Sequence, residues 1–204
     1  MKTHLSNTGL MEMEQRKRAH LINSVGGYKS VCLIGTINNA KETNLAIFSS
    51  IVHIGANPPL ISFIMRPDTV ERHTLTNILE TGFYTINHIN EAIYQQAHQT
   101  SARYPKDISE FDAVNLSTEF KNEFKAPFVK ESNVQLGIEF KEIINLTINN
   151  TLMVIGEINQ MYFPLDCLCD DGYLDIEKAG TISCTGLDSY HTGSRLERLD
   201  YAKP

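Results

Sequence analysis

The sequence lacks the features that mark several well-known classes of protein. Its 204 residues include no Trp and only four Cys, and the net charge is −6 at pH 7. Four cysteines in a chain of this length are too few for a disulfide-stabilised scaffold. The acidic balance disfavours nucleic acid as a partner, because phosphates require clustered Lys and Arg. With 42% hydrophobic and 21% charged residues, the chain has the composition of one globular domain.

Membrane and export signals are also missing from the pattern. The first twenty residues contain no apolar run of the kind found in secretory signals. Residues 43–65 contain no Asp, Glu, Lys or Arg, and the run is long enough to cross a bilayer. However, it includes Asn44, His53 and Asn57, whose polar groups lipid would leave unsatisfied. We therefore expect buried strands here, no membrane partner and a cytoplasmic location.

Familiar catalytic motifs are absent as well. The sequence contains no G-x-S-x-G, no Walker A motif, no H-E-x-x-H and no G-x-G-x-x-G. It thus does not support a serine hydrolase, P-loop, zincin or Rossmann interpretation. Cys167 and Cys169 are separated by one residue, and Cys184 follows without a matched partner. Because structural zinc sites need better-spaced ligand pairs, we predict ordinary thiols and no metal site.

What the sequence does contain is a succession of short strands with few helices. Residues 1–25 are polar and predict an N-terminal arm, which leaves 26–204 as one domain. Runs rich in β-branched and aromatic residues, bounded by turn residues, predict strands at 31–37, 45–54, 60–65, 83–87, 134–140, 142–148 and 151–163. This pattern favours a β-barrel with added helices.

Two helices are predicted between these strands. Asp68 and Glu71 have the spacing of a capping box for the first, and Gly82 is typical of its end. Its apolar stripe is predicted to contain Leu75, Ile78 and Leu79. The second helix is predicted to begin at a cap formed by Asn90 and to carry Ile93, Tyr94 and Ala97.

Two segments are candidates for a binding site. In residues 43–50, small and polar side chains would let backbone groups approach a flat polar ring, although an ordinary strand also explains them. Arg66 is followed by His73, Thr74 and Asn77 near a helix start, which suits a phosphate. The alternative is a solvated helix face turned away from Leu75.

The order of these pieces resembles the flavin reductase-like family of FMN-binding split barrels. The resemblance covers about residues 28–200. The segments that carry it are Asn44-Leu45-Ala46-Ile47-Phe48-Ser49-Ser50, Asn57-Pro58-Pro59-Leu60, Arg66, His73-Thr74-x-x-Asn77, Thr81-Gly82-Phe83, Ile108-Ser109-Glu110-Phe111-Asp112, Val154-Ile155-Gly156-Glu157-Ile158 and Gly186-Leu187-Asp188-Ser189-Tyr190.

This resemblance implies a mainly β fold, a six-stranded Greek-key split barrel with added helices. It also implies a homodimer with FMN at the interface. By likeness, the residues expected to line the flavin ring and ribityl chain are Asn44, Leu45, Ala46, Ser49 and Ser50. Those expected to hold the phosphate are Arg66, His73, Thr74 and Asn77. Tyr190 is expected to cover the flavin, from its own subunit or from the partner.

The resemblance further implies an oxidoreductase that passes electrons from NADH or NADPH through FMN. Such chemistry belongs largely to the cofactor and requires no general base, so no catalytic residue is assigned. Some family members carry a Gly-Asp-His turn where this chain has Asn149-Asn150-Thr151. This departure favours the flavoredoxin-like branch, in which electrons come from a redox partner protein. The alternatives are a non-catalytic FMN carrier or sensor and, more remotely, a split barrel that binds haem or another ring.

Overall fold

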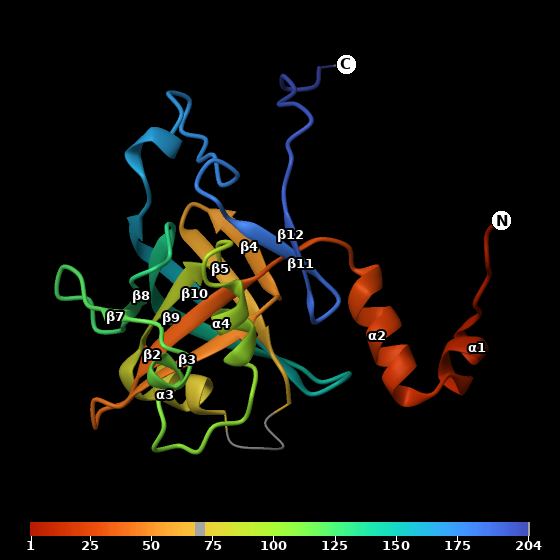
Figure 1. The fold of residues 1–204 in the computed structure, drawn as a ribbon, viewed down its shortest axis with the longest axis horizontal. Helices are drawn as coiled ribbons and strands as arrows, with labels where there is room; N and C mark the ends of the chain where they lie inside the picture. The colour runs from red at the N-terminus through yellow and green to blue at the C-terminus, as the bar shows by residue number, and fades with distance from the viewer. Residues whose placement is uncertain (68–71, 204) are drawn as a thin grey trace.

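The structure, a computed structural model, describes residues 1–67 and 72–203. Its main sheet is antiparallel, with seven strands in the order β3–β2–β6–β9–β10–β5–β4. These strands are β2 (Cys32–Ile37), β3 (Thr43–Phe48), β4 (Ile51–Ala56), β5 (Pro59–Met65), β6 (Phe83–His88), β9 (Gln135–Leu146) and β10 (Thr151–Tyr162). The two end strands, β3 and β4, are joined by only Ser49 and Ser50, so the sheet has to curl until its ends meet (Figure 1). The predicted mainly β, split-barrel fold is confirmed.

Two predicted strand boundaries were wrong. The predicted strand 45–54 is divided into β3 and β4, and the Ser50 hydroxyl bridges to β5 by accepting from Ile64 N and donating to Ile64 O, each at 3.1 Å. The predicted strands 134–140 and 142–148 are the single strand β9. The polar Lys141 suggests a turn in the sequence, but it lies at a β-bulge, because Ile155 pairs with Glu142 and Gly156 with Phe140.

The core has two layers, one on each face of β2. Inside the barrel, Ile34 packs with Phe63, Tyr84 and Ile138, all of them fully buried. On the outer face, neighbouring side chains of β2 and β3 pack beneath two short helices, α4 (Tyr94–Gln99) and α5 (Glu110–Ala113). Because successive side chains of a strand point to opposite faces, a strand covered on both faces reads as a continuous apolar run.

Helix α3 (His73–Thr81) packs across β2 and β3 through Leu75 and Ile78. Gly82 ends it in the left-handed conformation (φ 75°), as predicted. Leu79, however, is 56% exposed, so its assignment to the buried stripe was wrong. The buried face instead continues through Thr74 and Asn77. The capping pair Asp68 and Glu71 lies outside the described residues.

The second predicted helix begins later than expected. Asn90 Oδ1 accepts from Ala92 N in the turn before α4, and Ile93 is the residue that flanks the helix start. Asn90 therefore organises the approach to the helix and does not cap it. Ala97 lies within α4, as predicted, and is fully buried on the face that packs against the core.

Smaller elements surround the barrel (Figure 1). A second sheet has the order β1–β11–β12, formed by β1 (Lys29–Ser30), β11 (Ile182–Thr185) and β12 (Ser189–Thr192). The hairpin β7 (Thr118–Glu119) and β8 (Phe128–Val129) and the 3₁₀ turn η1 (Leu165–Cys167) complete the body. The predicted N-terminal arm forms α1 (Asn7–Glu12) and α2 (Gln15–Val25), which stand to one side of the barrel.

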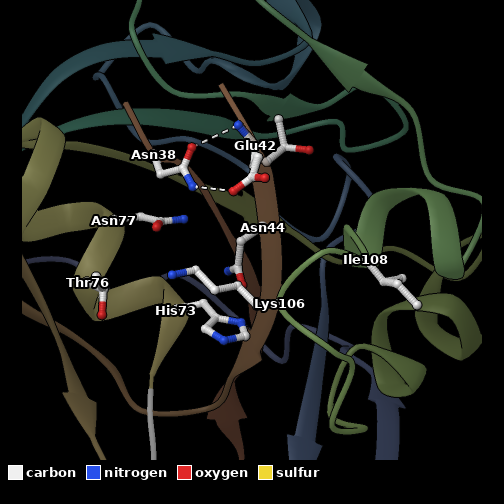
Figure 2. A pocket seen from close by; sticks show the side chains of 9 residues that line it. Asn38, Glu42, Asn44, His73, Thr76, Asn77, Lys106 and Ile108 are labelled. Carbon is white, nitrogen blue, oxygen red and sulfur yellow. Dashed lines mark hydrogen bonds between the residues drawn. The ribbon is translucent and has the colours of Figure 1, made fainter. Parts of the chain in front are cut away.

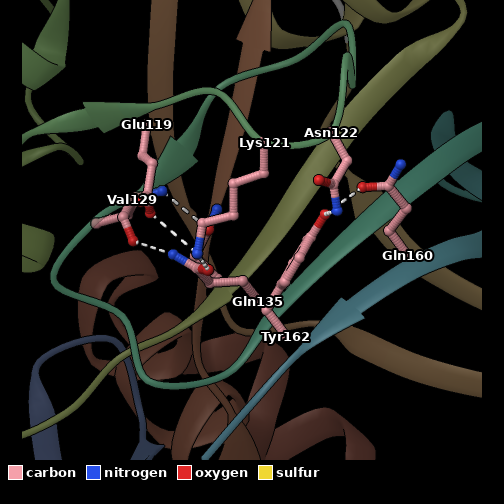
Figure 3. Close-up of polar contacts among 8 residues, drawn as sticks. Glu119, Lys121, Asn122, Val129, Gln135, Gln160 and Tyr162 are labelled. Carbon is pink, nitrogen blue, oxygen red and sulfur yellow. Dashed lines mark hydrogen bonds and ion pairs between the residues drawn. The ribbon is translucent and has the colours of Figure 1, made fainter.

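A polar network ties the β7–β8 hairpin to the barrel (Figure 3). The buried Gln135 of β9 donates from Nε2 to Val129 O at 2.6 Å and accepts from Lys121 Nζ at 2.6 Å. Lys121 also pairs with Glu119 at 3.0 Å, and its Nζ lies 4.7 Å from the centre of the Tyr162 ring. Each polar group of this buried amide is therefore satisfied, which holds the hairpin against the end of β9.

Gly35 of β2 allows the chain to approach the Pro127 carbonyl. A Cβ at this position would overlap that carbonyl oxygen and lie 2.7 Å from Thr85 Oγ1, which donates to the same oxygen. We expect Gly35→Ala to lower the free energy of unfolding by about 1–3 kcal/mol, through overpacking against backbone. Urea denaturation measures the loss, with Gly193→Ala as control because a Cβ there meets nothing within 4 Å. Equal stability of the two variants would contradict this account.

Candidate functional site

A small polar cavity lies between β3 and the N-terminal end of α3 (Figure 2). Its lining combines the β2–β3 hairpin, the first turns of α3 and a loop near residue 106. The lining residues are Asn38, Glu42, Thr43, Asn44, His73, Thr76, Asn77, Lys106 and Ile108. Three residues that the sequence singled out, Asn44, His73 and Asn77, are thus brought to one place.

Hydrogen bonds hold the amides of this cavity. Asn44 Nδ2 donates to Thr74 Oγ1 at 3.0 Å, and Asn77 Nδ2 donates to Thr36 Oγ1 at 3.1 Å. All four side chains are buried. The alternative of a solvated helix face is therefore wrong for Thr74 and Asn77, which face the barrel. Leu79 is exposed in their place because the polar side chains find hydrogen-bond partners on β2 and β3.

Basic side chains gather at the same end of α3. His73 and Lys106 line the cavity, and Arg72 flanks the helix start. Arg72 donates from Nη2 to Pro67 O at 3.4 Å, while its buried Nε has no hydrogen-bond partner among the described residues. The carboxylate of Glu42 accepts from Asn38 Nδ2 at 2.7 Å at the cavity's edge. The N–H groups at a helix start, with basic side chains nearby, form an environment that favours an anion.

The other predicted phosphate ligand, Arg66, lies apart from these groups. It is exposed and follows directly after the end of β5. The described residues that line the cavity do not include it. Its part in binding a phosphate therefore stays a prediction.

The segment predicted to line a flavin also makes contacts that hold the fold. The Leu45 side chain is fully buried in the outer core, and its N–H donates to Glu110 Oε2 at 3.0 Å. Its side chain therefore belongs to the core, and the expected contact of its backbone with a flavin stays a prediction. The Ser50 hydroxyl is occupied by the backbone of Ile64. Ala46 and Ser49 are half-buried and keep surface that a ligand could contact.

Tyr190 of β12 packs against its own chain. Its hydroxyl lies 2.8 Å from His98 Nδ1, and its ring centre lies 5.6 Å from that of Tyr94, so both contacts are to α4. It also packs on the outer core that contains Leu45 and Ile47. Burial raises the pKa of Tyr190 to about 12, so the phenol stays protonated at neutral pH.

Two residues of the site were missed by the sequence reasoning. Lys106 lines the cavity, and Glu110 binds the backbone of Leu45 from α5. A second contact from the same turn joins Ser109 Oγ to Thr43 Oγ1 at 2.8 Å. Burial raises the pKa of Glu110, and the Leu45 N–H and the His73 imidazole oppose this rise. The motif Ser109-Glu110-Phe111 was a usable signal for Glu110, whereas Lys106 lies in an unpatterned loop.

Comparison with known proteins places the chain in a family. A family model described as flavin reductase like domain matches residues 28–173. The chain belongs to this family. This membership confirms the resemblance inferred from the order of motifs and connects the chain with flavin-dependent oxidoreduction.

Solved structures agree with the family assignment. A split-barrel protein named as a flavin reductase, from Shewanella frigidimarina, is 49% identical and superimposes with a TM-score of 0.95, covering 98% of this chain and 100% of the other. Flavoredoxin of Desulfovibrio vulgaris is 21% identical with a TM-score of 0.74, covering 86% and 92%. A protein of Aquifex aeolicus is 29% identical over 103 residues, which is 50% of this chain and 53% of that protein.

Two further properties of the structure concern membranes and metals. In residues 1–67 and 72–203, no helix has the length and hydropathy needed to span a bilayer. The same described residues contain no group of three His, Cys, Asp or Glu side chains placed to hold a metal ion. The uncharged run 43–65 forms β3, β4 and β5.

The buried carboxylate of Glu110 leads to a stability prediction. Glu110→Ala leaves the Leu45 N–H without its acceptor, so we expect a loss of about 1–3 kcal/mol in the free energy of unfolding. Glu110→Gln keeps an acceptor oxygen and should lose much less.

The raised pKa of Glu110 also predicts a pH dependence. The free energy of unfolding of the natural protein, relative to that of Glu110→Gln, should fall as pH rises from the ordinary value of 4.5 through the pKa of Glu110 in the folded protein. Urea titrations across this range measure the difference, and a pH-independent difference would contradict the assignment.

Proposed function

We propose that the protein is a homodimeric FMN-binding oxidoreductase that passes electrons through bound FMN. The observation that supports this best is the cavity in which Asn44, His73, Asn77 and Lys106 meet at the start of α3. Amide donors, two basic side chains and the N–H groups of a helix start are the chemistry that binds a phosphate monoester. The family membership of the chain supports a flavin as the molecule that carries this phosphate.

The residues present fit FMN at both of its ends. His73, Asn77 and Lys106 would hold the phosphate, with Arg66 contributing from the end of β5. The uncharged segment 43–50 would receive the ring, through the Asn44 amide, the Ser49 hydroxyl and backbone groups near Ala46. FMN, when bound, supplies the capacity to accept a hydride or single electrons.

The protein's own contribution would be orientation and exclusion of water. The Asn44–Thr74 and Asn77–Thr36 hydrogen bonds fix two amides before any ligand arrives, which reduces the entropy lost on binding. Tyr190, held by His98 and Tyr94, would cover one side of the ring. In a homodimer, a second copy would complete the site.

The electron donor is either NADH or NADPH, or a redox partner protein. The turn between β9 and β10 carries Asn149, Asn150 and Thr151, and Asn149 Oδ1 accepts from both the backbone and the hydroxyl of Thr151. This turn contains no titratable side chain. That observation favours a protein donor, as in a flavoredoxin-like protein, and it also keeps a non-catalytic FMN carrier or sensor as the second candidate. Four free cysteines support a cytoplasmic location.

The phosphate assignment is tested by comparing FMN with riboflavin. We expect His73→Ala, Lys106→Gln and Arg66→Ala each to weaken FMN binding about ten- to a hundredfold and to leave riboflavin binding nearly unchanged, because only FMN carries the phosphate. Quenching of flavin fluorescence measures both affinities. Arg103→Gln is the control, since it removes an exposed cation from the loop of Lys106 without touching the cavity lining.

Two results would oppose this proposal in different ways. Equal losses for FMN and riboflavin would overturn the phosphate assignment and leave flavin binding in place. Failure of the natural protein to bind FMN at micromolar concentrations would overturn the function itself, and the absorption spectrum would then be examined for haem or another ring.

The choice between reductase and carrier is tested by anaerobic mixing. We expect the FMN-loaded protein to lose its flavin absorbance when a reduced partner or an excess of NADH or NADPH is added. Rapid loss with either nucleotide identifies a reductase. Loss only with a reduced redox protein identifies a protein-fed carrier of electrons. No loss with any donor favours the non-catalytic carrier or sensor.

A further inference from the structure

The N-terminal arm, residues 1–25, is an ordered unit held by its own hydrogen bonds. Ser6 Oγ caps α1 by accepting from Gly9 N at 3.1 Å. The Glu14 carboxylate caps α2 by accepting from Arg16 N and Lys17 N, each at 2.9 Å. The Arg18 guanidinium donates to two carbonyl oxygens of the corner between the helices, at 3.0 and 3.2 Å. The arm thus has capped helices and a hydrogen-bonded corner between them.

This folded arm makes few contacts with the rest of its chain, chiefly where α2 lies beside β11. Both helices are fully described, and neither contains a buried residue. Figure 1 shows the arm standing away from the barrel. Helices of 6 and 11 residues are marginal in water and normally gain their stability by burying an apolar stripe. Among the described residues, no surface of the same chain buries the apolar side chains of this arm.

The arm carries such a stripe. Leu21 and Val25 are four residues apart on α2, with Ile22 beside them, and Ile22 and Val25 are 50% and 72% exposed. Lys17 and Arg18 precede these residues on the same face of the helix. The exposed face therefore combines an apolar half with a basic half, which predicts a partner that is apolar and acidic.

The body of the chain, residues 26–204, has both properties. The arm contains four Lys or Arg and two Asp or Glu, so its net charge is +2. The body contains fourteen Lys or Arg and twenty-two Asp or Glu, so its net charge is −8. The body also exposes apolar surface on its end strand β4, where Val52 and Ile54 are 45% and 42% exposed and no residue is charged. Opposite charges attract the arm of one copy to the body of another.

We propose that the arm docks through Leu21, Ile22 and Val25 on the body of a second copy of this chain and thereby holds the dimer together. In a two-fold symmetric dimer each copy gives one arm and receives one, so the contact is made twice. This inference rests on the homodimer of the proposed function.

Full-length variants test the docking. Ile22→Gln combined with Val25→Gln removes apolar groups from the docking face and keeps the charge. Ala19→Gln combined with His20→Gln changes two exposed residues on the opposite side of the same helix and is the matched control. Sedimentation equilibrium gives the dissociation constant of the dimer, circular dichroism reports the helix content, and FMN affinity is measured on the same samples.

We expect the docking-face variant to raise the dimer dissociation constant at least about tenfold, and the control to leave it within about twofold. A rise with helix content unchanged supports the proposal. An unchanged dissociation constant for the docking-face variant, or a natural protein that sediments as a monomer, overturns it. FMN binding is measured separately. If FMN binds and the docking-face variant leaves the dimer dissociation constant unchanged, the proposal for the arm has failed, whereas the proposed cofactor has not.

Discussion

The outer edge of β3 is the constraint on which the candidate site depends. Among the described strands, β3 pairs only with β2, so the N–H groups of its other edge need side-chain acceptors or solvent. Glu110 supplies one acceptor to Leu45, and the Ser109–Thr43 contact adds a second link to α5. From the next residue along β3, Asn44 bonds Thr74 of α3. An end strand is thereby held in place by two helices that are distant in the sequence.

This arrangement places fixed amides beside the basic side chains of His73 and Lys106. The amides of Asn44 and Asn77 are buried and hydrogen-bonded, so they keep their orientation without a ligand. His73 and Lys106 sit at the mouth of the same cavity, at the positive end of α3. Hydrogen-bond donors that are already fixed in a region of positive potential suit an anionic ligand, because binding then costs little conformational entropy.

Sequence reasoning predicted the strands and the family correctly where the local pattern was strong. The run from Leu60 to Met65, the end of α3 at Gly82 and the order of motifs could be read directly. It was wrong at Lys141, where a polar residue suggested a turn and the chain instead makes a bulge within one long strand. It was also wrong about Leu79, because a helical stripe does not show which of two adjacent faces finds hydrogen-bond partners.

The sequence by itself determined the class of fold, the family and the residues Asn44, His73 and Asn77 as candidates, because these depend on local periodicity and on the order of motifs. Only the tertiary structure decided that Leu45 belongs to the core, that Tyr190 packs on α4 of its own chain, and that Lys106 and Glu110 belong with β3 and α3. These relations join segments up to about 145 residues apart, as Leu45 and Tyr190 do. They arise from apolar packing and hydrogen bonds between distant segments, which no local pattern in the sequence records.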